Sequence, residues 1–173
     1  MPYLHYCPDC GQSLPPEAQP TSRIAQQDCP ACGAVHYRNA KPTVGAIIVR
    51  DGKVLLGRRG GEPFLDWWDI PGGFLEPWEH PAAGLVRELR EETGLTIEVG
   101  ALLEVIVDTY GDQGDFTLNL YYLATAPFGE PRAADDVTEL GWFAPDALPE
   151  KVAFAAGRAV LERCRQRALP LAN

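Results

Sequence analysis

The segment at residues 73–95 constrains this chain most, because it places three carboxylates on one short predicted helix. Apolar residues recur at helical spacing over Pro81–Thr93. Glu88, Glu91 and Glu92 are three or four positions apart, so they share one face of that helix. Like charges at this spacing repel one another, and a cation would offset the repulsion. Hard divalent cations such as Mg²⁺ prefer oxygen ligands. The segment therefore predicts a divalent-metal site, against the alternative of a solvated acidic helix face.

The balance of charge narrows the class of function. The 173 residues are 46% hydrophobic and 23% charged, which is ordinary for a globular protein and excludes a disordered chain. The net charge is −9, and residues 41–150 carry twenty acidic and eight basic side chains. Binding to a nucleic-acid backbone needs a basic surface, so we expect no nucleic-acid partner. A phosphate substrate remains compatible with an acidic centre when metal ions lie between them.

The longest apolar runs, such as 44–49 and 101–107, are too short to span a membrane. The first residues, MPYLHYC, have neither the basic nor the apolar region of a signal peptide. We therefore expect a soluble, cytoplasmic protein with no membrane partner.

Two Cys-x-x-Cys-Gly elements near the N-terminus contribute four cysteines with the spacing of a tetrahedral zinc site: Cys7, Cys10, Cys29 and Cys32. Four thiolates fill the coordination shell, so the predicted Zn²⁺ is structural rather than catalytic. Disulfides are the weaker alternative without a secretory signal. His5 and His36 lie nearby and are expected to be loop histidines rather than ligands. Residues 1–37 thus predict a zinc ribbon that needs its metal to fold.

The rest of the chain contains short β-rich runs and a second segment with helical spacing. Strands are expected at 43–50, 54–58, 96–109, 117–125 and 139–143. Asp51-Gly52 predicts a hairpin between the first two strands. A second helix is expected over 152–168, with four residues facing the core: Val152, Ala156, Ala159 and Val160.

Residues 73–95 read GFLEPWEHPAAGLVRELREETGL and resemble the signature of the Nudix hydrolases. That signature is filled without departure by nine positions: Gly73, Glu79, Arg87, Glu88, Leu89, Glu91, Glu92, Gly94 and Leu95. The lead-in WDIPGG at 68–73 and GWF at 141–143 are also similar to the family, and the similarity covers roughly 38–168. The ribbon followed by YRNAKP resembles the branch that includes NADH, FAD and ADP-ribose pyrophosphatases.

This resemblance implies an α/β fold: a Nudix α/β/α sandwich with a mixed β-sheet at 38–173, preceded by the zinc ribbon. It implies that Mg²⁺ or Mn²⁺ is bound by Glu88, Glu91, Glu92 and the backbone carbonyl of Gly72 or Gly73. Catalysis would involve Arg87 and these glutamates, with Glu79 as the salt-bridge partner of Arg87. Which glutamate is the general base stays open. A further acidic ligand is expected among five downstream residues: Asp112, Asp115, Asp135, Asp136 and Glu139.

The implied activity is hydrolysis of the pyrophosphate bond in a nucleoside diphosphate linked to another moiety, such as ADP-ribose, FAD or another dinucleotide. The Ser-Gln-Pro-Trp-Pro-Phe-Pro stretch of NADH pyrophosphatases is absent from this sequence. Six aromatic residues are candidates to stack on a base: Trp67, Trp68, Phe74, Trp78, Tyr110 and Phe116.

The alternative is a non-catalytic nucleotide sensor or an RNA-associated module on the same fold. Such sensors usually lose glutamates of the signature or add a DNA-binding domain, and this chain does neither. We therefore favour an enzyme with a small nucleotide substrate. A homodimer is left open.

Overall fold

The computed structural model describes residues 4–14, 26–111 and 115–167. The chain divides into two compact units, Met1–Ala40 and Lys41–Asn173. The first unit contains an antiparallel pair of short strands, β1 (Gln26–Asp28) and β2 (Val35–Tyr37). All the other helices and strands belong to the second unit.

The second unit is built on a six-stranded mixed sheet. Its strands are β3 (Lys41–Arg50), β4 (Lys53–Arg59), β5 (Trp68–Asp69), β6 (Glu98–Thr109), β7 (Phe116–Thr125) and β8 (Val137–Phe143). The order is β5-β4-β3-β7-β6, and β8 also pairs with β4. The central pair β3–β7 is parallel, whereas the β3–β4, β4–β5, β4–β8 and β6–β7 pairs are antiparallel.

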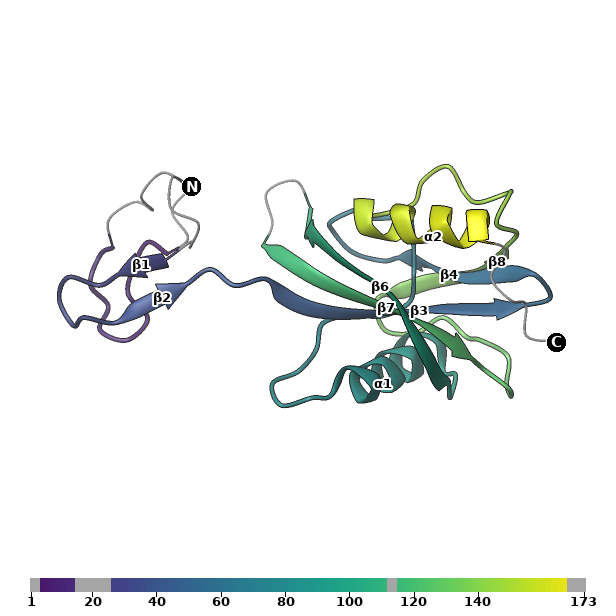
Figure 1. The fold of residues 1–173 in the computed structure, drawn as a ribbon, viewed down its shortest axis with the longest axis horizontal. Coiled ribbons are helices and arrows are strands. Elements are labelled where there is room, and N and C mark those ends of the chain that lie inside the picture. Colours follow the sequence, from purple (N-terminus) through teal and green to yellow (C-terminus); the bar gives the residue numbers. More distant parts are fainter. Residues whose placement is uncertain (1–3, 15–25, 112–114, 168–173) are drawn as a thin grey trace. The chain divides into compact units, whose positions relative to one another are not determined.

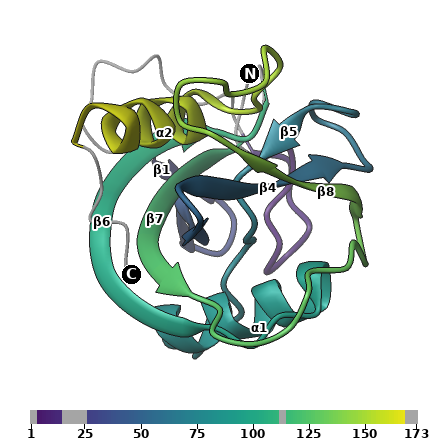
Figure 2. The same ribbon diagram turned by 90° about the vertical axis from the view of Figure 1, so that its right-hand side faces the viewer.

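Two helices cover opposite sides of this sheet, α1 (Pro81–Thr93) and α2 (Ala155–Arg167) (Figure 1). Viewed from the side, β6 and β7 curve around from α2 toward α1 (Figure 2). The arrangement is helix, sheet, helix, so the expected α/β/α sandwich with a mixed sheet is confirmed. None of the helices among the described residues is long and apolar enough to cross a lipid bilayer.

Successive side chains of β3 point to opposite faces of the sheet, so this strand contributes to the core on both sides. Val44, Ala46 and Ile48 are buried in the cluster that includes Leu85 and Leu89 of α1. Ile47 instead joins the cluster on the α2 side, whose helix residues include Val160 and Leu161. A central strand buried on both faces reads as a continuous apolar run rather than as an alternating one, as this strand does.

Most of the expected elements are present. The Asp51-Gly52 hairpin is confirmed: both residues have positive φ, 49° and 73°, as a type I′ turn requires. Helix α1 has the expected bounds, with His80 as N-cap and Gly94 as the left-handed C-cap. The two-residue strand β5 was not expected, because its residues carry no strand pattern of their own.

Helix α2 begins at Ala155, three residues later than its apolar spacing predicts. Lys151 and Ala153 are hydrogen-bonded to Trp68 of β5 through their backbones, which keeps this stretch extended. Phe154 then has a φ of 51°, so helical backbone cannot start before it. The expected inward position of Ala159 is wrong, since this residue is exposed at the edge of the buried stripe.

Candidate active site

A glycine pair in the loop after β5, Gly72 and Gly73, brings the backbone against β3 and toward α1. Gly72 has a φ of 142°, and a Cβ there would lie 2.1 Å from the carbonyl oxygen of Val44. No side chain fits that space, so glycine is required for this close approach. The carbonyl of Gly73 accepts a hydrogen bond from Val44 N at 2.9 Å. This contact places the loop directly opposite the carboxylates of α1.

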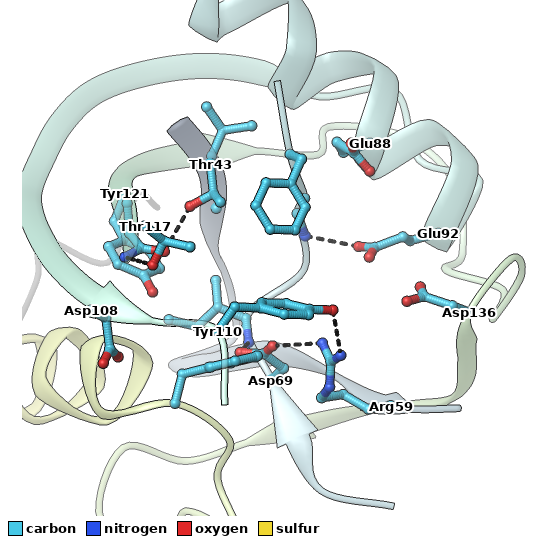
Figure 3. Close-up of a pocket in the computed structure, with 18 of the residues that line it drawn as sticks. Thr43, Arg59, Asp69, Glu88, Glu92, Asp108, Tyr110, Thr117, Tyr121 and Asp136 are labelled. Atoms are coloured by element: carbon cyan, nitrogen blue, oxygen red, sulfur yellow. Dashed lines mark hydrogen bonds and ion pairs between the residues drawn. The ribbon is translucent and has the colours of Figure 1, made fainter. Parts of the chain in front are cut away.

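Two of the three glutamates of α1 point into the same pocket, Glu88 and Glu92 (Figure 3). Glu92 is buried at 7% exposure, and its Oε2 accepts a hydrogen bond from Gly72 N at 2.8 Å. The side chain of Glu88 is 13% exposed. Glu91 is different: its side chain is 49% exposed and is not part of the pocket lining. The structure therefore brings together Glu88 and Glu92 but not Glu91.

Arg87 is the hub of an ion-pair network beside this pocket. Its guanidinium donates two hydrogen bonds to Glu79, at 2.9 and 2.8 Å. The same group donates to Glu88 at 2.8 Å and to Glu91 at 3.1 Å. These hydrogen bonds lower the pKa of Glu79 to about 2, so this carboxylate stays ionised and holds Arg87 in place. Arg87 in turn fixes the orientation of Glu88.

Three carboxylates in the pocket, Asp69, Glu88 and Glu92, are difficult to ionise without a cation. Burial raises the pKa of Glu92 well above its ordinary value, and the charges of Asp136, Glu88 and Asp69 add to the effect. Burial also raises the pKa of Glu88. Desolvation raises the pKa of Asp69 to about 6, although Arg59 opposes the shift. Such a set of buried acids fits a divalent cation, which would offset the repulsion and replace the lost water.

The pocket has a volume of about 280 Å³ and lies at one side of the β3–β7 pair. Six carboxylates line it, from α1, from the sheet and from the segment before β8: Asp69, Glu88, Glu92, Asp108, Asp135 and Asp136. Arg59 at the end of β4 is the one basic side chain among the described lining residues.

Aromatic rings form one wall of the pocket. Tyr110 stacks on Phe154 with ring centroids 5.4 Å apart and meets Phe74 edge-on at 5.3 Å. The guanidinium of Arg59 lies 5.0 Å from the Phe154 ring and donates to the Tyr110 hydroxyl at 3.2 Å. It also forms an ion pair with Asp69 at 3.3 Å. This wall of the pocket therefore consists of packed aromatic rings with the positive charge of Arg59 beside them.

Small polar side chains of β3 and β7 also line the pocket. Asn119 accepts a hydrogen bond from Thr43 at 2.7 Å and donates one to Thr117 at 3.0 Å. Tyr121 is 7% exposed, and its hydroxyl has no hydrogen-bond partner among the residues that the structure describes. Burial, Asp69 and Asp108 raise the pKa of Tyr121, so it remains a neutral donor.

The downstream acids expected as ligands divide into two groups. Asp135 and Asp136 line the pocket. Asp115 instead pairs with Lys41 at 2.6 Å and Glu139 with Arg58 at 3.3 Å. Asp112 lies outside the described residues.

Of the candidate stacking aromatics, Phe74 and Tyr110 line the pocket. Trp68 packs against Phe143, and Trp78 is fully exposed. Trp67 and Phe116 are likewise not among the lining residues.

Sequence reasoning missed several lining residues, notably Arg59, Asp69, Tyr121 and Phe154. Asp69 lies within the WDIPGG lead-in, and Arg59 follows directly after the strand expected to end at residue 58. These neighbouring motifs could have pointed to Arg59 and Asp69, but a strand pattern alone does not say which residue faces a pocket. No sequence signal pointed to Phe154, because its position depends on where α2 begins.

The four cysteines of the first unit converge. Their sulfur atoms lie within 4.8 Å of one another, with Cys7 and Cys32 at 3.8 Å and Cys10 and Cys29 at 3.6 Å. The two turns are equivalent: Gly11 N donates to Cys7 O and Gly33 N to Cys29 O, at 2.8 and 2.9 Å. This donor set suits a tetrahedral Zn²⁺ site.

His36 does not lie in a loop as expected; it lies in β2, with Nε2 3.3 Å from Cys7 Sγ. A histidine at this distance can donate its N–H to a thiolate that binds metal, a contact that orients the ligand.

Comparisons with known proteins show what this chain is similar to. The NUDIX domain family matches residues 39–164. The chain is 36% identical to an ADP-ribose pyrophosphatase of Methanocaldococcus jannaschii over 118 residues, which are 68% of this chain and 69% of that protein. It is 33% identical over 155 residues to the NAD-capped RNA hydrolase NudC of Pseudomonas aeruginosa, covering 83% of this chain but about half, 49%, of that protein.

A solved structure is similar over nearly the whole length. The crystal structure of a NUDIX hydrolase from Nitrosomonas europaea superposes with a TM-score of 0.78 and 25% identity. The match covers 95% of this chain and 92% of the Nitrosomonas chain.

Proposed function

Because the chain belongs to the Nudix family of pyrophosphohydrolases, we propose that it hydrolyses the pyrophosphate bond of a nucleoside diphosphate linked to another moiety. The observation that supports this most is the meeting of Glu88 and Glu92 with Asp136 in one pocket beside Gly72. The proposed substrates are ADP-ribose-like or FAD-like molecules. We further propose a zinc ribbon at residues 1–37 and a catalytic domain at 38–173.

The proposed Mg²⁺ or Mn²⁺ ligands are Glu88, Glu92 and the carbonyl of Gly72, with Asp136 as the downstream acid. The carbonyl of Gly73 already accepts a hydrogen bond from Val44, which favours Gly72 of the two. Glu91 remains a proposed ligand from the family signature, although its exposure and its contact with Arg87 support it less. When bound, the cation would neutralise pyrophosphate charge and make a water easier to deprotonate.

The protein's own groups have separate tasks in this proposal. Arg87, held by Glu79, keeps Glu88 oriented toward the pocket. A pocket carboxylate accepts the proton of the attacking water, for which a pKa nearer to neutrality is suited. Phe74 and Tyr110 offer ring faces to the nucleoside, and the Thr43–Asn119 pair borders the same space.

A substrate panel tests the reaction class and the substrate together. ADP-ribose, NADH, FAD, diadenosine polyphosphates and nucleoside triphosphates would be compared with Mg²⁺ present. We expect the highest kcat/KM for an ADP-ribose-like or FAD-like compound, because the sequence lacks the stretch found in NADH pyrophosphatases. A value for NADH more than tenfold above every other compound would contradict this substrate assignment.

Glu92→Gln tests the proposed metal site. The amide keeps the shape of the side chain and can still accept from Gly72 N, but it removes one negative charge. We expect kcat to fall by about 10²–10³-fold, the usual cost of losing a transition-state contact. Glu76→Gln is the matched control, since Glu76 lies in the same segment but is exposed and outside the pocket lining. Equal activity of the two variants would exclude Glu92 from the site.

A further inference from the structure

Arg59 is unusual in its surroundings. Among the described residues that line the pocket, six are carboxylates and Arg59 alone is basic. A nucleoside diphosphate is an anion, so these carboxylates repel it wherever no cation intervenes. A divalent cation bound by Glu88 and Glu92, as proposed above, would supply positive charge on the α1 side. Among the described lining residues, Arg59 is the one that supplies positive charge from the β4 side.

The guanidinium of Arg59 is held on several sides. Its Nε donates to Pro63 O at 2.8 Å, and its two terminal nitrogens donate to Asp69 at 3.3 Å and to Tyr110 at 3.2 Å. One face of the group lies over the Phe154 ring. Figure 3 shows Arg59 beside Asp69 and Tyr110. The side chain is only 13% exposed, so it has little freedom to reorient. Such preorganisation is what an anion-binding group needs to act without a further ordering cost.

These contacts do not use the whole group. An arginine side chain has five N–H donors, and the contacts to Pro63, Asp69 and Tyr110 engage three of them. Two terminal N–H donors therefore have no partner among the described residues, on a side chain that lines the pocket. Two donors on one planar cation match the oxygens of a phosphate group.

We propose that Arg59 contacts the substrate and binds a phosphate of its nucleoside diphosphate group, with Asp69 as the positioning residue. The inference rests on the proposed function. It adds to the proposed metal a protein side chain that binds the phosphate directly. It also separates Arg59 from Arg58, its neighbour on β4. Arg58 is 40% exposed, pairs with Asp66 and Glu139 and does not line the pocket.

The test compares a phosphate-bearing ligand with its phosphate-free counterpart. Binding of α,β-methylene-ADP, which cannot be cleaved between its phosphates, and of adenosine would be measured by calorimetry with and without Mg²⁺. In Arg59→Gln we expect affinity for α,β-methylene-ADP to fall about 10- to 100-fold, the range for charge-assisted hydrogen bonds. Affinity for adenosine should stay within about twofold of wild type, because the nucleoside carries no phosphate.

Three variants complete the series. Arg58→Gln should leave both affinities unchanged, which controls for loss of one positive charge on the same strand. Arg59→Lys keeps the charge but not the planar fork, so α,β-methylene-ADP should bind about tenfold more weakly and adenosine as before. Asp69→Asn keeps the size of the side chain and should weaken α,β-methylene-ADP binding less than Arg59→Gln does. If Arg59→Gln does not fold, Arg59→Lys carries the test alone.

Equal losses for both ligands would mean that Arg59 supports the nucleoside pocket instead, and this overturns the proposal. Unchanged binding of α,β-methylene-ADP, or no preference of the wild-type protein for it over adenosine, would do so as well. These outcomes are separate from the substrate panel. Hydrolysis by the wild type with no effect of Arg59 variants on binding contradicts only this inference, whereas Arg59-dependent binding without any hydrolysis contradicts only the proposed function.

Discussion

Glu92 is a buried carboxylate surrounded by other carboxylates. Its pKa is raised, so the folded protein without metal binds a proton at this site more tightly than the unfolded chain does. Stability of the metal-free protein therefore falls as pH rises from the ordinary glutamate pKa upward through the folded-state value. The repulsion between Glu92 and its neighbouring carboxylates destabilises the metal-free protein, and the same negative charges favour binding of a cation.

Thermal unfolding of Glu92→Gln in EDTA tests this linkage. The variant has no charge to bury, so its melting temperature should exceed that of the wild type at pH 8. The difference should shrink toward zero near pH 4, where the wild-type carboxyl is protonated in both states. Differential scanning calorimetry across this pH range gives the measurement, with Glu76→Gln as the control. A difference independent of pH would show that Glu92 does not titrate as described.

At the scale of the element, the N-terminus of helix α2 is capped by a residue of a strand. No acidic residue lies in its first turn, and Asp108 of β6 accepts a hydrogen bond from Ala156 N at 2.7 Å. The carboxylate thus takes the place of a capping residue, and its charge is favourable at a helix N-terminus. Because Asp108 also lines the pocket, the same contact ties α2 to the site.

Asp108→Ala should destabilise the second unit by about 1–2 kcal/mol, the usual cost of losing a helix cap. Urea unfolding followed by circular dichroism measures the change. Glu98→Ala, an exposed position on the same strand, should change stability by less than about 0.5 kcal/mol. Similar effects of the two substitutions would rule out capping of α2 by Asp108.

The elements differ in how far the sequence predicts them. Helix α1 and the Asp51-Gly52 hairpin are set by local signals, a helix-ending glycine and a turn dipeptide, so the sequence predicts them closely. The start of α2 is set by two backbone hydrogen bonds with Trp68, more than 80 positions earlier: Trp68 N donates to Lys151 O, and Ala153 N donates to Trp68 O. Arg59 and Asp69 are brought to the site by the pairing of β4 with β5, which joins residues ten to twelve positions apart. The periodicity of a single segment does not contain either kind of pairing.

At the scale of the whole molecule, the two units differ greatly in the size of their hydrophobic clusters. Among the described residues of the first unit, 4–14 and 26–40, the buried cluster comprises Cys7, Leu14 and Cys29, with Leu4 and Ala34 packed against it. So small a cluster buries too little apolar surface to fold alone, which is the physical reason to expect a metal there. The second unit has two larger clusters, one on each side of its sheet.

Purified protein should therefore contain close to one zinc per chain, as measured by elemental analysis. Cys29→Ser should release the metal and make the first unit sensitive to protease, while pyrophosphohydrolase activity is partly retained. Cys164→Ala is the matched control, since Cys164 is buried in α2 and should not affect zinc content. Protein made with zinc present that contains none would contradict the ribbon assignment.

The parallel pairing of β3 with β7 also sets an order of events during synthesis. The hydrogen bond between Thr43 and Asn119 joins residues 76 positions apart, and α1 lies between them in the chain. A ribosome adds roughly 5–20 residues per second, so about 4–15 s separate the emergence of the two strands. The nascent chain thus displays its acidic helix for seconds before β7 can pair with β3, and during that interval it has no pocket in which to bind a nucleotide.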